Sequence, residues 1–290
     1  MLSTFYSALH LPACKQIVHL KQMNSNAFLQ LQKYIIEDSD ELINEFLMNL
    51  IKECMREQEI FDSLNCIDKL ACLMKIRSIS CGDTVVFSNQ QNVQGQISMN
   101  HILNCMHDIN FNVSALHNNN QVQVMISLPH TLLLPNISSV IQSCLNAIIF
   151  NDSKIEMQKM PNEHVVEILN NLDSHTASYI YKFINNYADD LTLTVFTGNA
   201  TLQLESIILS PFNNSMLDFC KFILKDDLLN LYKNIHTLCS KSHLTPEFLM
   251  NIPPIEQQLY TKLLIDEIEQ TNKQLTEEHG GINMPAYGQV

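Results

Sequence analysis

The first quarter of the chain has the apolar spacing of helices. Residues 39–56 place apolar side chains three or four positions apart, as expected for a helix with one buried face. Residues 24–36 predict a helix before this segment, and residues 66–77 predict one after it. Residues 16–20 alternate as a strand does, so the chain is predicted to start with extended structure.

The helix predicted at residues 66–77 is apolar around most of its circumference, which indicates burial on more than one side. Its apolar positions are Ile67, Leu70, Leu73, Met74 and Ile76. Asn65 suits the N-cap position, and Asp68 can reach back to it in the manner of a capping box. The sequence therefore predicts a central helix with a defined start.

A corner is predicted at the end of this helix. Arg77 ends the apolar run, and Gly82 provides a backbone that can turn into a strand at residues 84–87. We define the helix-corner by Asp68, Arg77, Ser80 and Gly82. The role expected for these four residues is structural rather than chemical.

After residue 83 the apolar period changes from that of a helix to that of a sheet. Strands are predicted at residues 84–87, 121–128 and 154–160. Helices are predicted between them at residues 99–109 and 138–149, and the asparagines at 118–120 predict a turn. This alternation predicts a small, largely antiparallel sheet packed against helices.

The second half of the chain is predicted to be mostly helical. Helices are expected at residues 163–171, 177–188, 215–238 (with a break at Asp226-Asp227) and 254–275. Thr245-Pro246-Glu247 combines a cap, a proline and an acidic first turn, which together predict a helix start. Residues 191–196 and 201–207 flank a Gly-Asn turn and predict a β-hairpin.

These elements predict an α+β fold that is predominantly helical, with a small antiparallel sheet in the N-terminal half and a β-hairpin in the C-terminal half. We expect an α+β lobe at residues 1–160 and a helical lobe at 161–278. Residues 279–290 form a tail with apolar anchors at Ile282, Met284 and Tyr287. The sequence leaves open whether this tail frays or docks on a neighbour.

Charge argues against two classes of partner. The chain has a formal net charge of −13 and a pI of about 5.2, and we find no Lys/Arg cluster of the kind that neutralises phosphates. We therefore expect no nucleic-acid binding and no attraction to anionic membranes. Residues 1–10 lack the features of a secretory signal, and the longest apolar runs are too short to span a bilayer. Folding in cytoplasm without membrane insertion is the expectation.

Candidate chemistry is sparse. Cys66, Cys72 and Cys81 are close in sequence, but none of the nine cysteines belongs to a Cys-x-x-Cys or Cys-x-x-His pair, so core packing is favoured over zinc. The chain has no nucleophile elbow, and its six glycines form no phosphate-binding loop. The carboxylate pairs Asp189-Asp190 and Asp226-Asp227 suit helix ends. We expect no catalytic site, no cofactor and no metal.

Two stretches together resemble a known family. The first is Asp68-Lys69-Leu70 followed by Lys75-Ile76-Arg77-Ser78-Ile79-Ser80-Cys81-Gly82, and the second runs from Ile252-Pro253-Pro254 to Glu267-Ile268-Glu269. This pairing resembles the T4-type baseplate hub proteins of contractile-tailed bacteriophages (myoviruses). The chain departs from the family pattern at Gln257, where an arginine is usual, and at Cys81, which separates Ser80 from Gly82.

The resemblance implies a structural component of the central hub in the virion's tail baseplate, made in the host cytoplasm and without enzymatic activity. Its partners would be other baseplate, hub and tail proteins within a symmetric multi-protein complex. Two alternatives stay open at this point. One is an assembly chaperone that is absent from the mature particle, and the other is a cytoplasmic zinc or thiol protein unrelated to phage.

Overall fold

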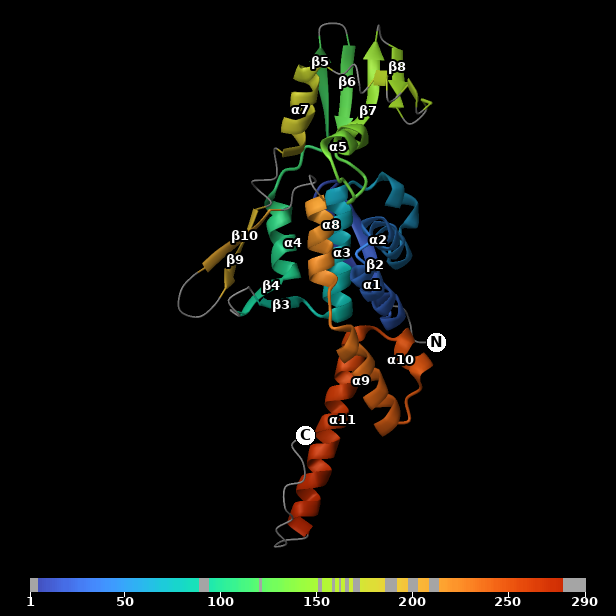
Figure 1. Cartoon of the computed structure of the whole chain (residues 1–290), viewed down its shortest axis with the longest axis vertical. Coiled ribbons are helices and arrows are strands. Elements are labelled where there is room, and N and C mark those ends of the chain that lie inside the picture. Colours follow the sequence, from blue (N-terminus) through green and yellow to red (C-terminus); the bar gives the residue numbers. More distant parts are fainter. Residues whose placement is uncertain are drawn as a thin grey trace. The chain divides into compact units, whose positions relative to one another are not determined.

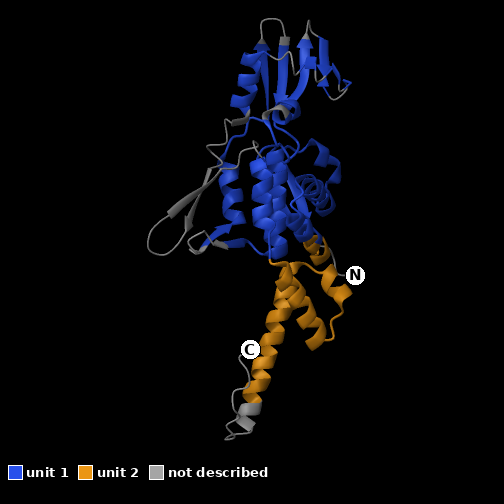
Figure 2. Ribbon diagram, in the orientation of Figure 1, with its two compact units in different colours: residues 1–23, 30–226 blue, residues 24–29, 227–290 orange. Residues whose placement is uncertain are grey.

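The chain divides into two compact units in the computed structural model (Figure 2). Unit 1 comprises residues 1–23 and 30–226, and unit 2 comprises residues 24–29 and 227–290. The structure describes residues 5–88, 94–119, 122–150, 153–157, 160–161, 163–164, 167–168, 173–185, 192–197, 203–208 and 214–278. The fold is α+β and predominantly helical, with antiparallel sheets, which confirms the predicted class (Figure 1).

Helices occur along most of unit 1. In chain order they are α1 (Ser25–Glu37, whose first residues belong to unit 2), α2 (Asp40–Cys54), the 3-10 helix η1 (Gln58–Ser63), α3 (Cys66–Cys81), α4 (Met99–Asp108), α5 (Ile137–Cys144), α7 (Ser174–Asn185) and α8 (Ser215–Leu224). Among these, α3 is the central element, because it packs against α2, α4, α8, β1 and β2 (Figure 1).

The described strands of unit 1 form three antiparallel sheets. The first pairs β1 (Tyr6–His10) with β2 (Ile17–Lys21). The second has the order β10-β9-β4-β3 and consists of β3 (Thr84–Ser88), β4 (Gln94–Ser98), β9 (Thr192–Thr197) and β10 (Gln203–Ile208). The third has the order β5-β6-β7-β8 and consists of β5 (Ser114–Asn119), β6 (Val122–Ser127), β7 (Leu145–Phe150) and β8 (Ser153–Glu156). Helices α5 and α7 pack on this third sheet.

The core of unit 1 forms around α3, whose whole N-terminal part is buried. Residues 66–74 and Ile76 are all buried, so the helix has no solvent-facing side there. A helix that is apolar all round is stable only when neighbours cover every side, and α3 has them. The unusual distribution of apolar residues that the sequence shows over 66–77 is explained by this central position.

Side-chain caps fix several helix starts where the sequence predicts them. Asn65 Oδ1 accepts the backbone N–H of Asp68 at 3.0 Å and so caps α3. Asp227 accepts the N–H groups of Leu229 and Asn230, and this cap begins α9 at the break predicted at Asp226-Asp227. Each cap joins residues only two or three positions apart, so the sequence alone can indicate it.

Unit 2 consists of a short segment, residues 24–29, and three C-terminal helices. These are α9 (Leu228–Lys241), α10 (Pro246–Asn251) and α11 (Pro254–Glu278). Ser25 donates both its backbone N–H and its hydroxyl to the carbonyl of Ile252. Thr245 Oγ1 accepts the N–H of Phe248, which confirms the predicted start of α10.

Two predictions about helix ends are wrong. The helix predicted at 138–149 ends at Cys144, and residues 145–150 form strand β7 between β6 and β8. The apolar run Ala147-Ile148-Ile149 suits a strand paired on both edges as well as it suits a helix. Helix α3 continues to Cys81 rather than ending near Arg77, so only Gly82 lies at the turn itself.

Other differences concern strands. The sequence did not predict β4, and β5 extends into the asparagine run that was predicted to be a turn. The strand predicted at 154–160 is observed at 153–156. In the helix predicted at 163–171, residues 163–164 and 167–168 are helical, and the others lie outside the described residues.

The hairpin predicted in the second half is confirmed as β9 and β10. Gly95 of β4 pairs with Thr197 of β9, so one sheet takes strands from both sides of residue 160. The division into lobes at residues 1–160 and 161–278 stays a prediction. No helix in the described part of the chain combines the length and the apolar character that crossing a membrane requires.

Candidate functional site

Asp68 is a fully buried carboxylate in the first turn of α3. Its Oδ1 accepts the backbone N–H of Ala13 at 2.9 Å, and its Oδ2 accepts the N–H of Cys14 at 3.2 Å. Asn65 Nδ2 donates to Oδ2 at 2.9 Å. Burial raises the pKa of Asp68, while the hydrogen bonds oppose this rise because they stabilise the charged form. Asp68 therefore holds the loop between β1 and β2 against α3.

The capping box predicted for Asp68 has a different form in the structure. The carboxylate reaches the side-chain amide of Asn65 rather than its backbone N–H. The backbone groups that it binds come from Ala13 and Cys14, more than fifty positions earlier in the chain. The local signal located the residue correctly, but the longer-range partners could not be inferred from spacing.

Arg77 and Ser80 attach the other end of α3 to its neighbours. Ser80 Oγ accepts the backbone N–H of Met23 at 2.9 Å. Arg77 Nε donates to the carbonyl of Ile223 at 2.8 Å, and its Nη1 donates to the carbonyl of Gly82. Ile223 is near the end of α8 and Gly82 follows α3, so one guanidinium binds the carbonyl ends of two helices. A cation is stabilising at that position because helix C-termini carry partial negative charge.

Gly82 makes the turn out of α3. Its φ is 98° and its ψ is 159°, a region that is essentially restricted to glycine. A Cβ built at this position would meet no atom within 4 Å. The requirement for glycine therefore comes from the backbone conformation and not from lack of space.

The four helix-corner residues do not converge on one site. Asp68 and Ser80 are twelve positions apart on α3, which corresponds to about 18 Å along a helix axis. Each of them binds backbone groups of a different segment. This arrangement can hold segments together, and it offers no common point at which a substrate could react.

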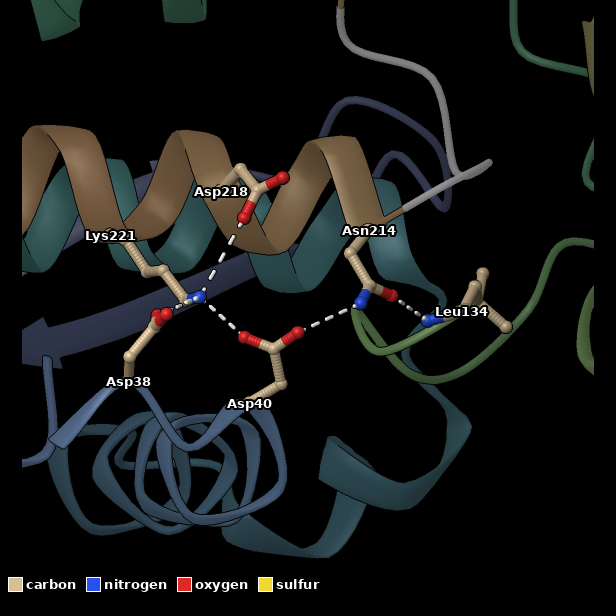
Figure 3. A network of polar contacts seen from close by, with 6 residues as sticks. All are labelled: Asp38, Asp40, Leu134, Asn214, Asp218 and Lys221. Atoms are coloured by element: carbon tan, nitrogen blue, oxygen red, sulfur yellow. Dashed lines mark hydrogen bonds and ion pairs between the residues drawn. The ribbon is translucent and has the colours of Figure 1, made fainter. Parts of the chain in front are cut away.

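A polar network that the sequence did not indicate joins α2, α8 and the segment around Leu134 (Figure 3). Lys221 of α8 forms ion pairs with Asp38 at 3.3 Å and with Asp218 at 3.7 Å, and it also binds Asp40. Asn214 donates to Asp40 at 3.0 Å and accepts the N–H of Leu134 at 2.9 Å. More than 170 positions separate Asn214 and Lys221 from the two aspartates, so no sequence pattern could link them.

The network depends on two left-handed backbone positions. Asp38 has a φ of 52° and Asn214 has a φ of 58°. Aspartate and asparagine tolerate this conformation better than most residues. Burial lowers the pKa of Lys221, but its hydrogen bonds to Asp40 and Asp38 raise it by more, so the net shift of the pKa is upward. The lysine is charged at neutral pH.

Five of the nine cysteines are core residues. Cys54, Cys66, Cys72, Cys144 and Cys220 are buried, and all nine thiols are free. Burial raises the pKa of Cys54, Cys66 and Cys81 to about 12 in each case. Such thiols stay protonated and unreactive at neutral pH. Within the described residues, no group of three or more His, Cys, Asp or Glu side chains is arranged to hold a metal ion.

The candidate interaction residues of the tail, Ile282, Met284 and Tyr287, lie outside the described residues. Their role in docking stays a prediction.

Replacing Asp68 should show how far unit 1 depends on this carboxylate. We expect Asp68→Ala to lower the free energy of unfolding by about 2–4 kcal/mol, because it leaves the buried N–H of Ala13 and the part-buried N–H of Cys14 without acceptors. Urea denaturation followed by circular dichroism measures this change. The exposed Asp108→Ala is the matched control and should change stability by less than about 0.5 kcal/mol. Equal effects of the two substitutions would show that Asp68 does not hold the loop.

Replacing Lys221 should give a pH-dependent effect. We expect Lys221→Met to cost about 1–2 kcal/mol at pH 7, because three carboxylates lose their shared cation. The pKa of Lys221 is raised in the folded protein. The difference in free energy of unfolding between the wild type and Lys221→Met is therefore complete below the unfolded pKa of about 10.4, and it is lost as pH rises through the folded pKa. Urea denaturation at pH 7, 9 and 11 measures this difference.

Lys225→Met is the control for this series, since Lys225 is exposed just after the same helix. A loss of stability that is the same at pH 7 and pH 11, or that Lys225→Met reproduces, would contradict a role for the ammonium charge.

Comparison with known proteins gives one match. No curated protein sequence and no solved structure matches the chain. The family model described as "T4 bacteriophage base plate protein" matches residues 4–210. This segment contains the helix-corner, the three sheets and helices α1 to α5 and α7, and it covers well over half of the 290 residues. The chain belongs to the T4 bacteriophage base plate protein family.

Proposed function

We propose that this base plate protein is a structural component of the central hub of the phage tail baseplate and acts through protein–protein contacts. The family match over residues 4–210 is the observation that carries the proposal. The geometry of the helix-corner supports it, since those side chains bind backbone groups and bring no reactive groups together. On this proposal the protein is not an enzyme, and its location is the tail of the virion.

The exposed apolar side chains of α11 support a role in contacts between proteins. Leu259 is 57% exposed and Leu263 is 63% exposed, one helical turn apart on the same side. Ile265 is 50% exposed and Ile268 is 43% exposed, but at 3.6 residues per turn both lie on the other side of the helix. The candidate contact surface therefore consists of Leu259 and Leu263, and adjacent large apolar side chains mark interaction sites more often than single ones do. Helix α11 begins after the family match ends at residue 210, so this surface is additional to the shared part.

Charged side chains of both signs lie on the same helix. Among the side chains of α11 that the structure describes, the exposed acidic residues are Asp266, Glu267 and Glu269, and the exposed basic residues are Lys262 and Lys273. A neighbouring baseplate protein that complements Leu259 and Leu263 would present apolar side chains bordered by charges of both signs. A contact of standard size buries roughly 1,200–2,000 Å² in total, which α11 and its surroundings would share with the partner.

Two further parts of the proposal concern the organisation of the chain. We infer that residues 1–160 and 161–278 act as lobes that separate framework from contact surface, with the hairpin β9–β10 joined to the framework through Gly95 and Thr197. We also infer that the tail, through Ile282, Met284 and Tyr287, docks on a neighbour in the assembled baseplate. Other hub and tail proteins in a symmetric complex are the partners that this organisation fits.

The composition of purified particles tests the structural role directly. We expect this protein at a fixed ratio to the other baseplate proteins when particles are washed in high salt and analysed by quantitative mass spectrometry, because a structural subunit remains in its complex. A host protein of similar abundance in the lysate serves as the control for carry-over. Absence from mature particles, with presence in partly assembled baseplates, would support an assembly chaperone instead.

The apolar surface of α11 is tested by a pair of substitutions. We expect Leu259→Gln together with Leu263→Gln to reduce incorporation into baseplates at least about ten-fold, since losing two anchor side chains costs more than about 1.4 kcal/mol. Stability of the isolated protein should change little, because both side chains are exposed. Sedimentation of complemented lysates measures incorporation.

Lys262→Gln together with Glu269→Gln is the matched control on the same helix, and it leaves the net charge unchanged. Normal incorporation of the leucine variant would remove α11 from the contact surface, and an equal defect in the control would show that the contact does not depend on the two leucines.

A further inference from the structure

A small pocket lies where the loop between β1 and β2 meets the end of α4, within unit 1. Its described lining consists of His10, Leu11, Lys15 and His107, and its volume is about 260 Å³. His10 and Lys15 are exposed, so a ligand can reach the pocket from solvent. The volume is below the usual range for cofactor sites, which indicates a ligand of only a few heavy atoms.

The described polar groups of the pocket are all donors or potential donors, and none is acidic. The imidazole rings of His10 and His107 lie edge to face with centroids 6.3 Å apart. Lys15 Nζ makes a long hydrogen bond of 3.4 Å to the carbonyl of Ile109, which leaves other ammonium protons available. Three basic side chains are thus grouped in a chain whose net charge is −13.

The backbone that carries Lys15 is held in place by several contacts. Lys15 has a φ of 57°, a left-handed conformation that is uncommon for lysine. The backbone N–H of Lys15 donates to the carbonyl oxygen of Leu11 at 3.1 Å, and the N–H of Leu11 donates to the carbonyl oxygen of Gln16 at 2.8 Å. The preceding residues, Ala13 and Cys14, are bound by Asp68. A disfavoured backbone that is fixed from both sides directs the lysine to the pocket mouth, and strain of this kind is concentrated at functional sites.

We propose that this pocket binds a carboxylate group, with Lys15 supplying the charge and the imidazoles of His10 and His107 supplying N–H donors. This assignment extends beyond the role in the baseplate and does not depend on it. The ligand is either the side chain of an acidic residue on another protein or a free small organic acid, and both present the same group.

The charge of the pocket matches a monoanion. Burial lowers the pKa of His107, and the nearby His10 and Lys15 lower it further, while Asp108 acts in the opposite direction. His107 is therefore neutral at pH 7 and contributes one N–H donor. Lys15 is left as the fixed positive charge, which balances one carboxylate. A phosphate carries between one and two negative charges at pH 7, so a single lysine leaves part of its charge unbalanced.

Histidine NMR on the full-length protein tests the proposal. The probes are sodium acetate and the blocked aspartate N-acetyl-aspartic acid amide, each compared with sodium chloride at equal ionic strength. The imidazole C–H signals of His10 and His107, assigned with His10→Gln and His107→Gln, should shift with saturation as acetate is added. The pKa of His107 should rise in the complex, because a bound anion favours the imidazolium form.

Lys15→Gln should weaken acetate binding about ten-fold, as expected for loss of one charge-assisted hydrogen bond. The exposed Lys33→Gln should bind as the wild type does. Should Lys15→Gln fail to fold, His107→Gln provides the same comparison through the His10 signal. Saturation by both probes assigns the ligand to a protein side chain, and saturation by acetate alone assigns it to a free acid. Shifts no larger than those in chloride, affinity unchanged in Lys15→Gln, or tighter binding of inorganic phosphate than of either probe would overturn the proposal.

Discussion

A carboxylate without contact to solvent must find donors inside the protein, and the donors that Asp68 finds determine how unit 1 is assembled. Two of them are backbone N–H groups of the loop between β1 and β2, and the third is the amide of the residue that caps α3. Removing these donors would leave the buried carboxyl group of Asp68 without most of its hydrogen bonds, which costs several kcal/mol. The first sheet is therefore fixed to α3 by a polar contact as well as by apolar packing.

The remaining polar contacts of α3 follow the same principle. Its middle is apolar and packs on every side, which is stabilising but does not by itself define a register. The alignment of α3 with its neighbours is fixed near its ends. There Asp68 binds the loop between β1 and β2, Ser80 binds Met23, and Arg77 binds the end of α8. Hydrogen bonds to backbone groups of particular residues allow only one alignment. A framework protein needs this property more than it needs a reactive group.

What could be predicted from the sequence depended on whether the determining contact is local. Asn65 and Thr245 cap their helices as predicted, and Asp227 caps α9 at the predicted break, because a cap involves residues two or three positions apart. The helix prediction was wrong at residues 145–149, which form a strand. Their apolar run fits a helix and a strand equally well, and pairing with β6 and β8 decides between the two. The network around Lys221 could not be predicted, since it joins residues more than 170 positions apart.

This chain has few cationic side chains, and some of them bind partners inside unit 1. Several of its 17 lysines and arginines are committed to the interior of unit 1. Lys69 donates to the carbonyl of His130 with its ammonium group 4.5 Å from the ring of Phe61, and Arg77 and Lys221 bind the partners described above. Cations used in this way are not available to attract an acidic partner over a distance. The two surfaces proposed above fit this limit, since α11 offers apolar area and the pocket around Lys15 offers a local grouping of basic side chains. A subunit that meets its neighbours during ordered assembly, rather than by diffusion over long distances, can work with short-range contacts of this kind.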